Sequence, residues 1–429
     1  MMKIEAVLPS CRDRWLATSG KGQKLNGREQ KMKLLVTQPL SCNVKGYLQL
    51  VTSKQVSRNW RMTGTHKLGL IQASLVVGLG LMSQISSAIA QTPPNSPQSF
   101  LEWCNQRPTL AKEAQSTVDL LLAIVGTTNC QQATKELAGM TSLMLVNSDL
   151  SDLRPLTSLK QLEVLLLNNN RITDISPLAT LTNLTVLTLD TNRISDITAL
   201  SSLTNLRVLT LDTNQISDLR PLQPLTQLTN LLLYSNKISD LRPLSALTNL
   251  RALSLYQNQI TDLSPLAPLQ SLEVLSLYSN KISDLSPLAS LTNLKTLTLF
   301  ENQIADLSPL AALANLETLT LFENKISDLS PLSQLNNLKE LIIGNNPIAN
   351  LQPLGTLKSL QKLALFNTQV VDISPLKTST QLTNLDLYNT RVADVTMLKN
   401  LSNLRELDLR KTPLKQKTCP VQPASICRF

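Results

Sequence analysis

The sequence predicts an α/β solenoid, an arc of short units with a parallel β-sheet on its concave face and a helical N-terminal cap. Three observations indicate this fold. A 22-residue pattern starts at Leu159 and recurs without insertion or deletion through the unit that starts at Ser379. Inside each unit, apolar residues alternate with period two, as expected for one short strand. A pair of cysteines stands at each end of the repeats. Stacked units of this kind bury a core that no single unit could bury alone.

We number the positions of each unit as slots 1–22, counted from Leu159. Leucine recurs at slots 1, 4, 7, 9, 17 and 20 and isoleucine at slot 14, so these side chains are expected to face the core. Slots 6–10 are expected to form the strand. A degenerate first unit begins near Leu137 and a truncated last unit at Leu401, which gives about thirteen units over residues 137–414. The consensus LxxLxxLxLxxNxIxDLxPLxx is a leucine-rich repeat.

Two polar slots have local backbone roles. Slot 12 is Asn in nine consecutive units, from Asn170 to Asn346, and its amide can bond backbone groups where the chain leaves the strand. It then becomes Thr368, Thr390 and Thr412, which can keep part of that role. Slot 16 is Asp in nearly every unit, and Pro usually follows at slot 19, which is typical of a turn into a helix. A periodic Asp with this role needs no ion, so we expect no metal site and no cofactor.

Both ends of the repeats need a cover. Residues 99–136 predict two helices around Gly126 that cap the first unit, and residues 415–429 predict a C-terminal cap. Outside the first 90 residues the cysteines form two close pairs, which predicts disulfides in an oxidising compartment. Metal binding is the weaker interpretation, because the spacing is not CxxC and no histidine follows residue 90. The expected disulfides are Cys104–Cys130 and Cys419–Cys427.

The basic charge lies in one segment. The chain has 40 Lys+Arg and 30 Asp+Glu, a formal net charge of +10. Residues 1–90 contain 13 of the basic and 3 of the acidic residues, so 27 of each sign remain in residues 91–429. The neutral balance of the longer segment argues against a nucleic-acid partner.

Residues 62–90 have the layout of a secretory signal peptide. An apolar run over residues 68–82 is shorter than the roughly 20 residues that a membrane span needs, and Ala88-Ile89-Ala90 follows it. We therefore expect cleavage after Ala90, no stable membrane span afterwards, and a secreted or periplasmic product. Residues 91–98 then form a Pro-rich linker.

Residues 1–61 are long for the charged start of a signal peptide. They are interpreted as a non-native extension, with Met62 as the true start, or as a cytosolic extension ahead of a signal anchor.

Slot 10 concentrates the aromatic residues. Residues 91–429 contain ten aromatic residues, and seven of them occupy this slot, with Gly344 as the one gap. Because slots 6, 8 and 10 face away from the core, we expect an exposed apolar stripe on the concave face, and such stripes mark interaction sites. Slot 13 contains no acid and provides a cationic rim. The stripe consists of Tyr234, Tyr256, Tyr278, Phe300, Phe322, Phe366 and Tyr388, and the rim cations are Arg171, Arg193, Lys237, Lys281, Lys325 and Arg391.

The same column has a purely structural interpretation. Equivalent side chains on adjacent strands stack, and each aromatic cross-strand pair contributes roughly 0.2–1 kcal/mol. The units that start at Leu291 and Leu313 are nearly identical, so duplication can have copied the ring. Binding and stacking are compatible, and both remain open from the sequence.

The frame LTNLxxLxLxxNxIxDLxPL resembles the repeats of internalins, the secreted bacterial leucine-rich-repeat proteins. The resemblance covers roughly residues 137–414. It implies a curved solenoid with a helical cap that holds a protein partner on its concave sheet. The sequence departs from that family in having no immunoglobulin-like segment after the repeats and no LPxTG-type anchor, so host invasion does not carry over.

We therefore expect a monomeric, non-enzymatic module that binds a protein on its concave face. A carbohydrate or cell-envelope glycan on the same face is an alternative, because rings flanked by amides and small hydroxyls suit sugars. A cytosolic scaffold is another, because phosphatase-regulatory repeat subunits resemble the same frame. Catalysis by Ser-His or Cys-His is excluded without a histidine after residue 90. The four glycines of residues 91–429 form no phosphate-binding loop.

Overall fold

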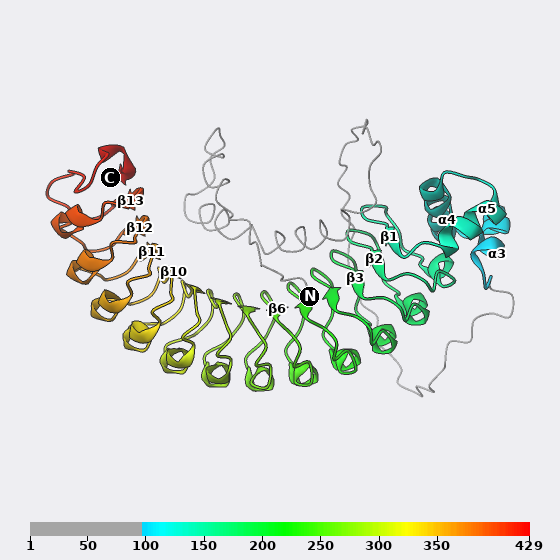
Figure 1. Cartoon of the computed structure of the whole chain (residues 1–429), viewed down its shortest axis with the longest axis horizontal. Coiled ribbons are helices and arrows are strands. Elements are labelled where there is room, and N and C mark those ends of the chain that lie inside the picture. Colours follow the sequence, from blue (N-terminus) through cyan, green and yellow to red (C-terminus); the bar gives the residue numbers. More distant parts are fainter. Residues whose placement is uncertain (1–96) are drawn as a thin grey trace, which may run out of the picture. The chain divides into compact units, whose positions relative to one another are not determined.

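The structure is a computed structural model that describes residues 97–429. The predicted extension 1–61, the signal peptide 62–90 and most of the linker 91–98 lie outside the described residues. Within the described part, one sheet of fourteen parallel strands runs in sequence order from β1 to β14. The strands line the inner side of the arc and short 3-10 helices follow its outer side (Figure 1). The solenoid with a parallel sheet on its concave face is confirmed.

From β1 to β13, each strand pairs with the strand of the next unit at a fixed offset of one repeat. Leu165 of β2, for example, is the partner of Leu187 in β3. The central residue of each repeat strand is a buried leucine that faces the core. The strands are β1 (Ser142–Met144), β2 (Val164–Leu166), β3 (Val186–Thr188), β4 (Val208–Thr210), β5 (Asn230–Leu232), β6 (Ala252–Ser254), β7 (Val274–Ser276), β8 (Thr296–Thr298), β9 (Thr318–Thr320), β10 (Glu340–Ile342), β11 (Lys362–Ala364), β12 (Asn384–Asp386), β13 (Glu406–Asp408) and β14 (Cys427–Arg428).

The strands are shorter than the five residues expected, because regular strand geometry covers only slots 6–8. Backbone pairing between units continues beyond them: the N–H of Leu167 donates to the carbonyl of Thr188 at 2.8 Å. At slot 11 the backbone turns into the left-handed region, as at Asn169 with φ 56°. This left-handed residue bends the chain out of the sheet, so the strand ends early while the hydrogen-bonded stack persists.

The slot-12 asparagines form the predicted ladder. Asn192 donates from Nδ2 to the carbonyls of Leu189 (2.9 Å) and of Leu167 in the preceding unit (3.1 Å). Its Oδ1 accepts the N–H of Ile172 at 3.0 Å. Thr368 keeps one of these bonds, from its hydroxyl to the carbonyl of Leu365 at 2.7 Å.

The sequence analysis missed a second asparagine ladder at slot 3. Asn183 donates from Nδ2 to the carbonyl of Lys160 at 2.9 Å, and Asn205 does the same to Thr182. The recurring Thr-Asn-Leu at slots 2–4 was the signal for it. This ladder joins the units where the chain returns from the outer side to the sheet.

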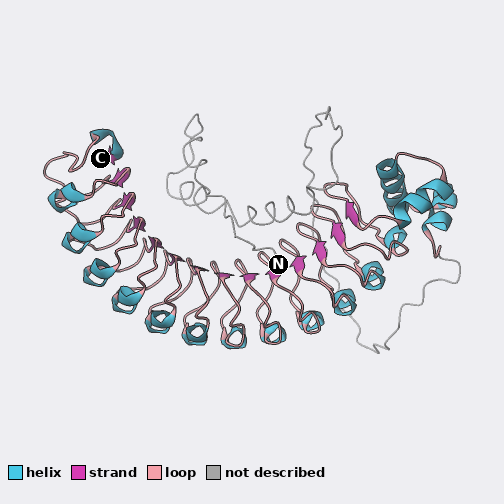
Figure 2. Cartoon of the chain, in the orientation of Figure 1, coloured by secondary structure: helices cyan, strands magenta, loops and turns pink. Residues whose placement is uncertain are grey.

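The slot-16 aspartates start the outer helices, as expected. Oδ1 of Asp174 accepts the N–H of Ser176 at 2.8 Å, directly before Pro177. Figure 2 shows the helices as a row opposite the strands. They are η2 (Arg154–Leu156), η3 (Ser176–Thr180), η4 (Thr198–Ser202), η5 (Arg220–Leu222), η6 (Arg242–Leu244), η7 (Ser264–Leu266), η8 (Ser286–Ser290), η9 (Ser308–Ala312), η10 (Ser330–Gln334), η11 (Gln352–Thr356), η12 (Ser374–Thr378) and η13 (Thr396–Asn400).

The N-terminal cap has more helices than the two expected. Helices α4 (Lys112–Val125) and α5 (Cys130–Ala138) flank Gly126, whose φ of 69° ends α4. Before them come α3 (Phe100–Asn105) and η1 (Arg107–Thr109). The side chain of Ser99 caps α3 by accepting the N–H of Glu102. The segment that contains Cys104 is therefore a separate helix.

Disulfides close both caps. Cys104–Cys130 joins α3 to α5, and the buried Phe100 and Trp103 seal the core beside it. Cys419–Cys427 closes the other end, where η14 (Ala424–Ile426) leads into β14 and extends the sheet by one strand. In residues 97–429 no helix is both long enough and apolar enough to cross a membrane.

Candidate binding surface on the sheet

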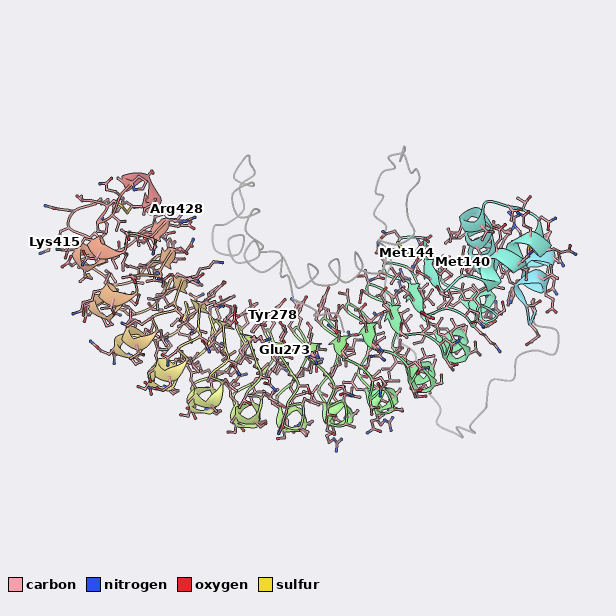
Figure 3. All side chains as sticks on the ribbon, viewed as in Figure 1. Met140, Met144, Glu273, Tyr278, Lys415 and Arg428 are labelled. Carbon is pink, nitrogen blue, oxygen red and sulfur yellow. A yellow bond between two sulfur atoms is a disulfide. The ribbon has the colours of Figure 1, made fainter. Side chains whose placement is uncertain are left out.

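Five of the seven slot-10 rings form a continuous stack across adjacent strands. Their centroids are 4.0–4.2 Å apart and neighbouring planes differ by 8–13°. The fixed register of the sheet causes this, because each ring leaves the backbone directly beside its equivalent one repeat away. Figure 3 shows Tyr278 projecting toward the inside of the arc. The stacked rings are Tyr234, Tyr256, Tyr278, Phe300 and Phe322.

The expectation that this stripe is exposed was wrong for its centre. Tyr256 is 3% exposed and Tyr278 is 7% exposed, while the other stacked rings are half-buried. In a stack at this spacing each ring covers the faces of its neighbours, so mainly edges remain for another molecule. Burial accordingly raises the pKa of Tyr256 and Tyr278, and that of Tyr234 to about 12.

The gap at Gly344 is filled by the ring of the next unit. A Cβ at Gly344 would lie 2.6 Å from ring atoms of Phe366. Glycine therefore lets the Phe366 ring lean over the neighbouring strand toward Phe322, at 6.1 Å and a tilt of 52°. The row continues past the gap, with a change of orientation.

Tyr388 is not part of the stack. Its ring makes cation–π contacts instead. The guanidinium of Arg410 lies 5.4 Å from the ring centroid, and the ammonium of Lys411 lies 5.0 Å from it. Arg410 also pairs with the carboxylate of Asp408. This last ring is therefore held by charged groups of the final repeat.

Slot 10 changes from aromatic to acidic in the earlier units. Asp190 and Asp212 occupy it directly before Tyr234, and the N–H of Asp212 donates to Oδ1 of Asp190 at 3.2 Å. The N–H of Tyr234 donates to Oδ1 of Asp212 at 2.8 Å. Burial raises the pKa of Asp190 to about 6 and that of Asp212 well above its usual value, to which the neighbouring Asp190 adds. The two carboxyl groups thus hold protons more tightly than free aspartates do.

The rim at slot 13 is exposed throughout, as a solvent-facing row requires. Within residues 97–429, Arg171 is the one rim cation in an ion pair, with Asp149. The other five predicted rim cations have no carboxylate partner among the described residues. The rim can therefore attract acidic groups without first breaking a pair.

The apolar side chains most open to solvent on this face were not predicted. Met144 of β1 is 55% exposed, and Val146 beyond it is also exposed. Met140 and Met144 lie at the cap end of the inner side (Figure 3). Their signal in the sequence was weak, because the first unit is degenerate and contains no aromatic residue at slot 10.

Titratable groups give no sign of a metal centre in residues 97–429, where no three His, Cys, Asp or Glu side chains come together. The groups that this face presents for non-covalent binding are ring edges, methionine, small hydroxyls and cations.

The repeats match a known family. The family described as Leucine Rich repeats (2 copies) matches residues 160–202, 182–224, 226–268, 270–312, 314–356 and 336–378. Among solved structures, internalin F of Listeria monocytogenes is 37% identical over 73% of this chain and 94% of its own, with a TM-score of 0.70. The chain therefore belongs to the leucine-rich repeat proteins and is of the bacterial internalin-like type.

Other similar structures share the fold at lower identity. The functional domain of internalin J of Listeria monocytogenes, which includes a cysteine ladder, is 24% identical over 72% of this chain and 75% of its own, with a TM-score of 0.51. A plant peptide hormone receptor, RGFR1 in complex with RGF2, is 21% identical over 63% of this chain and 49% of its own, with a TM-score of 0.55. None of the curated proteins compared with the chain matches it.

Proposed function

We propose that this protein is an exported, non-enzymatic recognition module that binds a protein partner through the concave face of its sheet. The observation that carries the proposal is the pairing of an apolar row with an acid-free rim. The rings from Tyr234 to Phe366 occupy slot 10 of their units, and the exposed slot 13 of the same row of units carries cations that, apart from Arg171, have no acidic partner in the described part of the chain. Apolar contact at the centre and complementary charge at the edge are the usual composition of a protein interface.

Relatives support this proposal. Proteins of the internalin type are typically protein-interaction modules, and the chain is similar to internalin F over most of its repeats. The plant receptor of the same fold is in complex with a peptide hormone, RGF2. Met144 and Val146 add exposed apolar area at the cap end, which a partner could cover.

Export and the lack of catalysis are also part of the proposal. Two disulfides, one at each end, suit an oxidising compartment. The rings of this surface are stacked on one another and the recurring aspartates accept backbone hydrogen bonds. The surface therefore suits binding of a partner and supplies no side chain arranged for catalysis. We propose a secreted or periplasmic monomer on this basis.

The proposal is tested by crosslinking from the rim. A photoreactive side chain at Gln259 or Gln303, between the rim lysines, is compared with one at Lys377 on the outer helix η12, using an extract of the producing cells. We expect one protein to crosslink from the rim positions only. A partner that crosslinks equally from Lys377 contradicts the concave site.

Affinity for that partner then decides the role of the rim. Lys237→Glu, Lys281→Glu and Lys325→Glu together should weaken binding about tenfold, equivalent to about 1.4 kcal/mol. The matched control reverses the exposed Lys160, Lys377 and Lys399 and changes net charge equally. Equal effects of both triples would contradict a specific rim.

A further inference from the structure

The central part of the slot-13 rim alternates between two kinds of side chain. Lysine and glutamine take turns from unit to unit, so the lysines lie two units apart. All six side chains are exposed, and none of them has a hydrogen-bond or ion-pair partner within residues 97–429. The six residues are Gln215, Lys237, Gln259, Lys281, Gln303 and Lys325.

The other edge of the concave sheet has its charges paired. At slot 5, directly before the strands, the five consecutive units from Arg251 to Lys339 all carry a charged side chain. The carboxylate of Glu273 pairs with Arg251 at 2.9 Å and with Lys295 at 2.7 Å. Glu317 pairs with Lys339 at 2.7 Å. A charged partner would have to break these pairs, whereas the slot-13 lysines of the same region are free to accept one.

The spacing of the lysines is fixed by the backbone of the rim. The N–H of Lys281 donates to the carbonyl of Ile260 in the preceding unit at 2.9 Å, and that of Gln303 donates to the carbonyl of Ile282 at 2.8 Å. Units that are bonded in this way lie roughly 4.8 Å apart, as the strands of a sheet do, so lysines two units apart are separated by about 10 Å.

An extended peptide matches both members of the alternation. In a polyproline II helix, every third side chain lies on the same side, at a repeat of about 9.3 Å. The backbone groups of such a segment form no internal hydrogen bonds, so they are available to the glutamine amides, which both donate and accept. An α-helix with acids seven residues apart has a similar repeat of roughly 10.5 Å, but its backbone groups are already bonded to one another.

Two carboxylates beside the rim limit how acidic the segment can be. Glu301 and Glu323 occupy slot 11, two residues before the rim position of their units. The hydroxyl of Ser279 donates to Glu301, and Nδ2 of Asn345 donates to Glu323 at 3.1 Å. A run of consecutive acids would meet these like charges. Acids that are spaced to reach only the lysines avoid most of this repulsion.

We propose that the partner contributes a polyproline II segment with an acidic residue at every third position, whose carboxylates pair with Lys237, Lys281 and Lys325. The backbone between these acids bonds the amides of Gln259 and Gln303. This inference rests on the proposed protein-binding function and adds the chemistry of the segment that the rim holds.

Synthetic peptides test the proposal. The full chain is titrated, with fluorescence anisotropy as the readout, with a labelled peptide of five Glu-Pro-Ala repeats and with a peptide of the same composition whose five glutamates are consecutive. We expect the periodic peptide to bind with a Kd below about 1 mM. The clustered peptide should bind at least about threefold more weakly, because it pairs with fewer lysines and each exposed pair contributes little.

Exchanging two rim residues tests the spacing itself. Gln259→Lys with Lys281→Gln moves one cation by one unit and leaves the net charge unchanged, so affinity for the periodic peptide should fall about threefold, the contribution of one exposed ion pair. Lys160→Gln with Gln161→Lys is the matched control, because it is the same exchange at two exposed residues outside the rim. This control should bind like the unsubstituted protein.

Four outcomes would overturn the proposal: no binding of the periodic peptide up to millimolar concentrations, equal binding of the two peptides, unchanged affinity in the rim exchange, or tighter binding of an alanine-rich helix with glutamates seven residues apart. Crosslinking from Gln259 and Gln303 is a separate measurement. A protein captured at these positions while the periodic peptide fails removes this inference and leaves the proposed function standing. Failure of capture at both positions counts against the function itself.

Discussion

Asp212 is held out of water next to a second carboxyl group. It is 3% exposed, and it lies one unit away from Asp190 at the start of the ring stack. No cation of the described residues forms an ion pair with either side chain. The raised pKa of each group therefore represents a cost of ionisation that the folded state bears at neutral pH.

We predict that Asp212→Asn stabilises the protein at pH 7 and not at pH 4. A folded-state pKa above the unfolded value means that the folded state binds the proton more tightly, so stability falls as pH rises from the usual range of a free aspartate through the raised pKa of Asp212. Asparagine removes this loss and can still accept the N–H of Tyr234. The unfolding free energy of the variant at pH 7 should therefore exceed that of the unsubstituted protein, measured as the difference between their denaturation curves across pH.

The exposed Asp284 is the control of opposite sign. The hydroxyl and N–H of Ser286 lower the pKa of Asp284, so its contribution is present at neutral pH and is lost as pH falls through the lowered pKa. Asp284→Asn should therefore destabilise the protein at pH 7, and the stabilities of the two proteins should converge at acidic pH, below the lowered pKa of Asp284. If both substitutions change stability in the same direction at pH 7, the explanation for Asp212 is wrong.

At the scale of the element, the ring stack answers part of the question that the sequence left open. Rings at 4.0–4.2 Å with nearly parallel planes contribute to the stability of the sheet whether or not they bind a partner. The periodicity predicted which residues form the column, because the rings recur in the same slot of the repeat. It could not predict how deeply the rings are buried, because burial depends on how far each ring leans over its neighbour. The missing side chain at Gly344, for example, lets the ring of Phe366 lean over the neighbouring strand.

We predict that Tyr278→Ser costs more stability than Tyr388→Ser. Tyr278 loses two stacked neighbours and a buried side chain, so the expected cost is about 3 kcal/mol. Tyr388 lies outside the stack against Arg410 and Lys411, and its loss should cost about 1 kcal/mol. Equilibrium denaturation of the two variants checks this. Equal costs would show that stacking adds no stability, which would strengthen binding as the reason for the column.

For the polar slots, too, the sequence predicts some of the interactions and misses others. The slot-16 Asp turns follow from chemistry local to one unit, and the Asn ladder follows from a side chain that recurs at the same slot of nine consecutive units, so both were predicted. The loss of the ladder bond at Ile348 was not predicted: in the described residues its N–H has no acceptor, because Thr368 stands where the other units have the accepting Asn. The exposed Met144 escaped prediction for a related reason: the first unit departs from the consensus, so the pattern gave no frame for its surface.

At the scale of the molecule, each repeat contacts only its neighbours, so the caps protect the ends of a nearly one-dimensional stack. The two disulfides close loops of different length, with separations of 26 residues for Cys104–Cys130 and 8 for Cys419–Cys427. Loop-closure entropy then assigns about 3.5 kcal/mol to the first and about 1 kcal/mol less to the second. The first bond also holds α3 against α5 over the exposed end of the core.

We predict that Cys104→Ala with Cys130→Ala loosens the N-terminal end without loosening the C-terminal end. Amide hydrogen exchange should accelerate from α3 to about β2 and stay unchanged in β10–β13, since the effect must pass from unit to unit. Cys419→Ala with Cys427→Ala is the mirror variant and should affect β13 and β14 with a smaller loss of global stability. Uniform acceleration along all strands in either variant would instead mean that the solenoid opens as one cooperative unit, and that its caps stabilise every repeat equally.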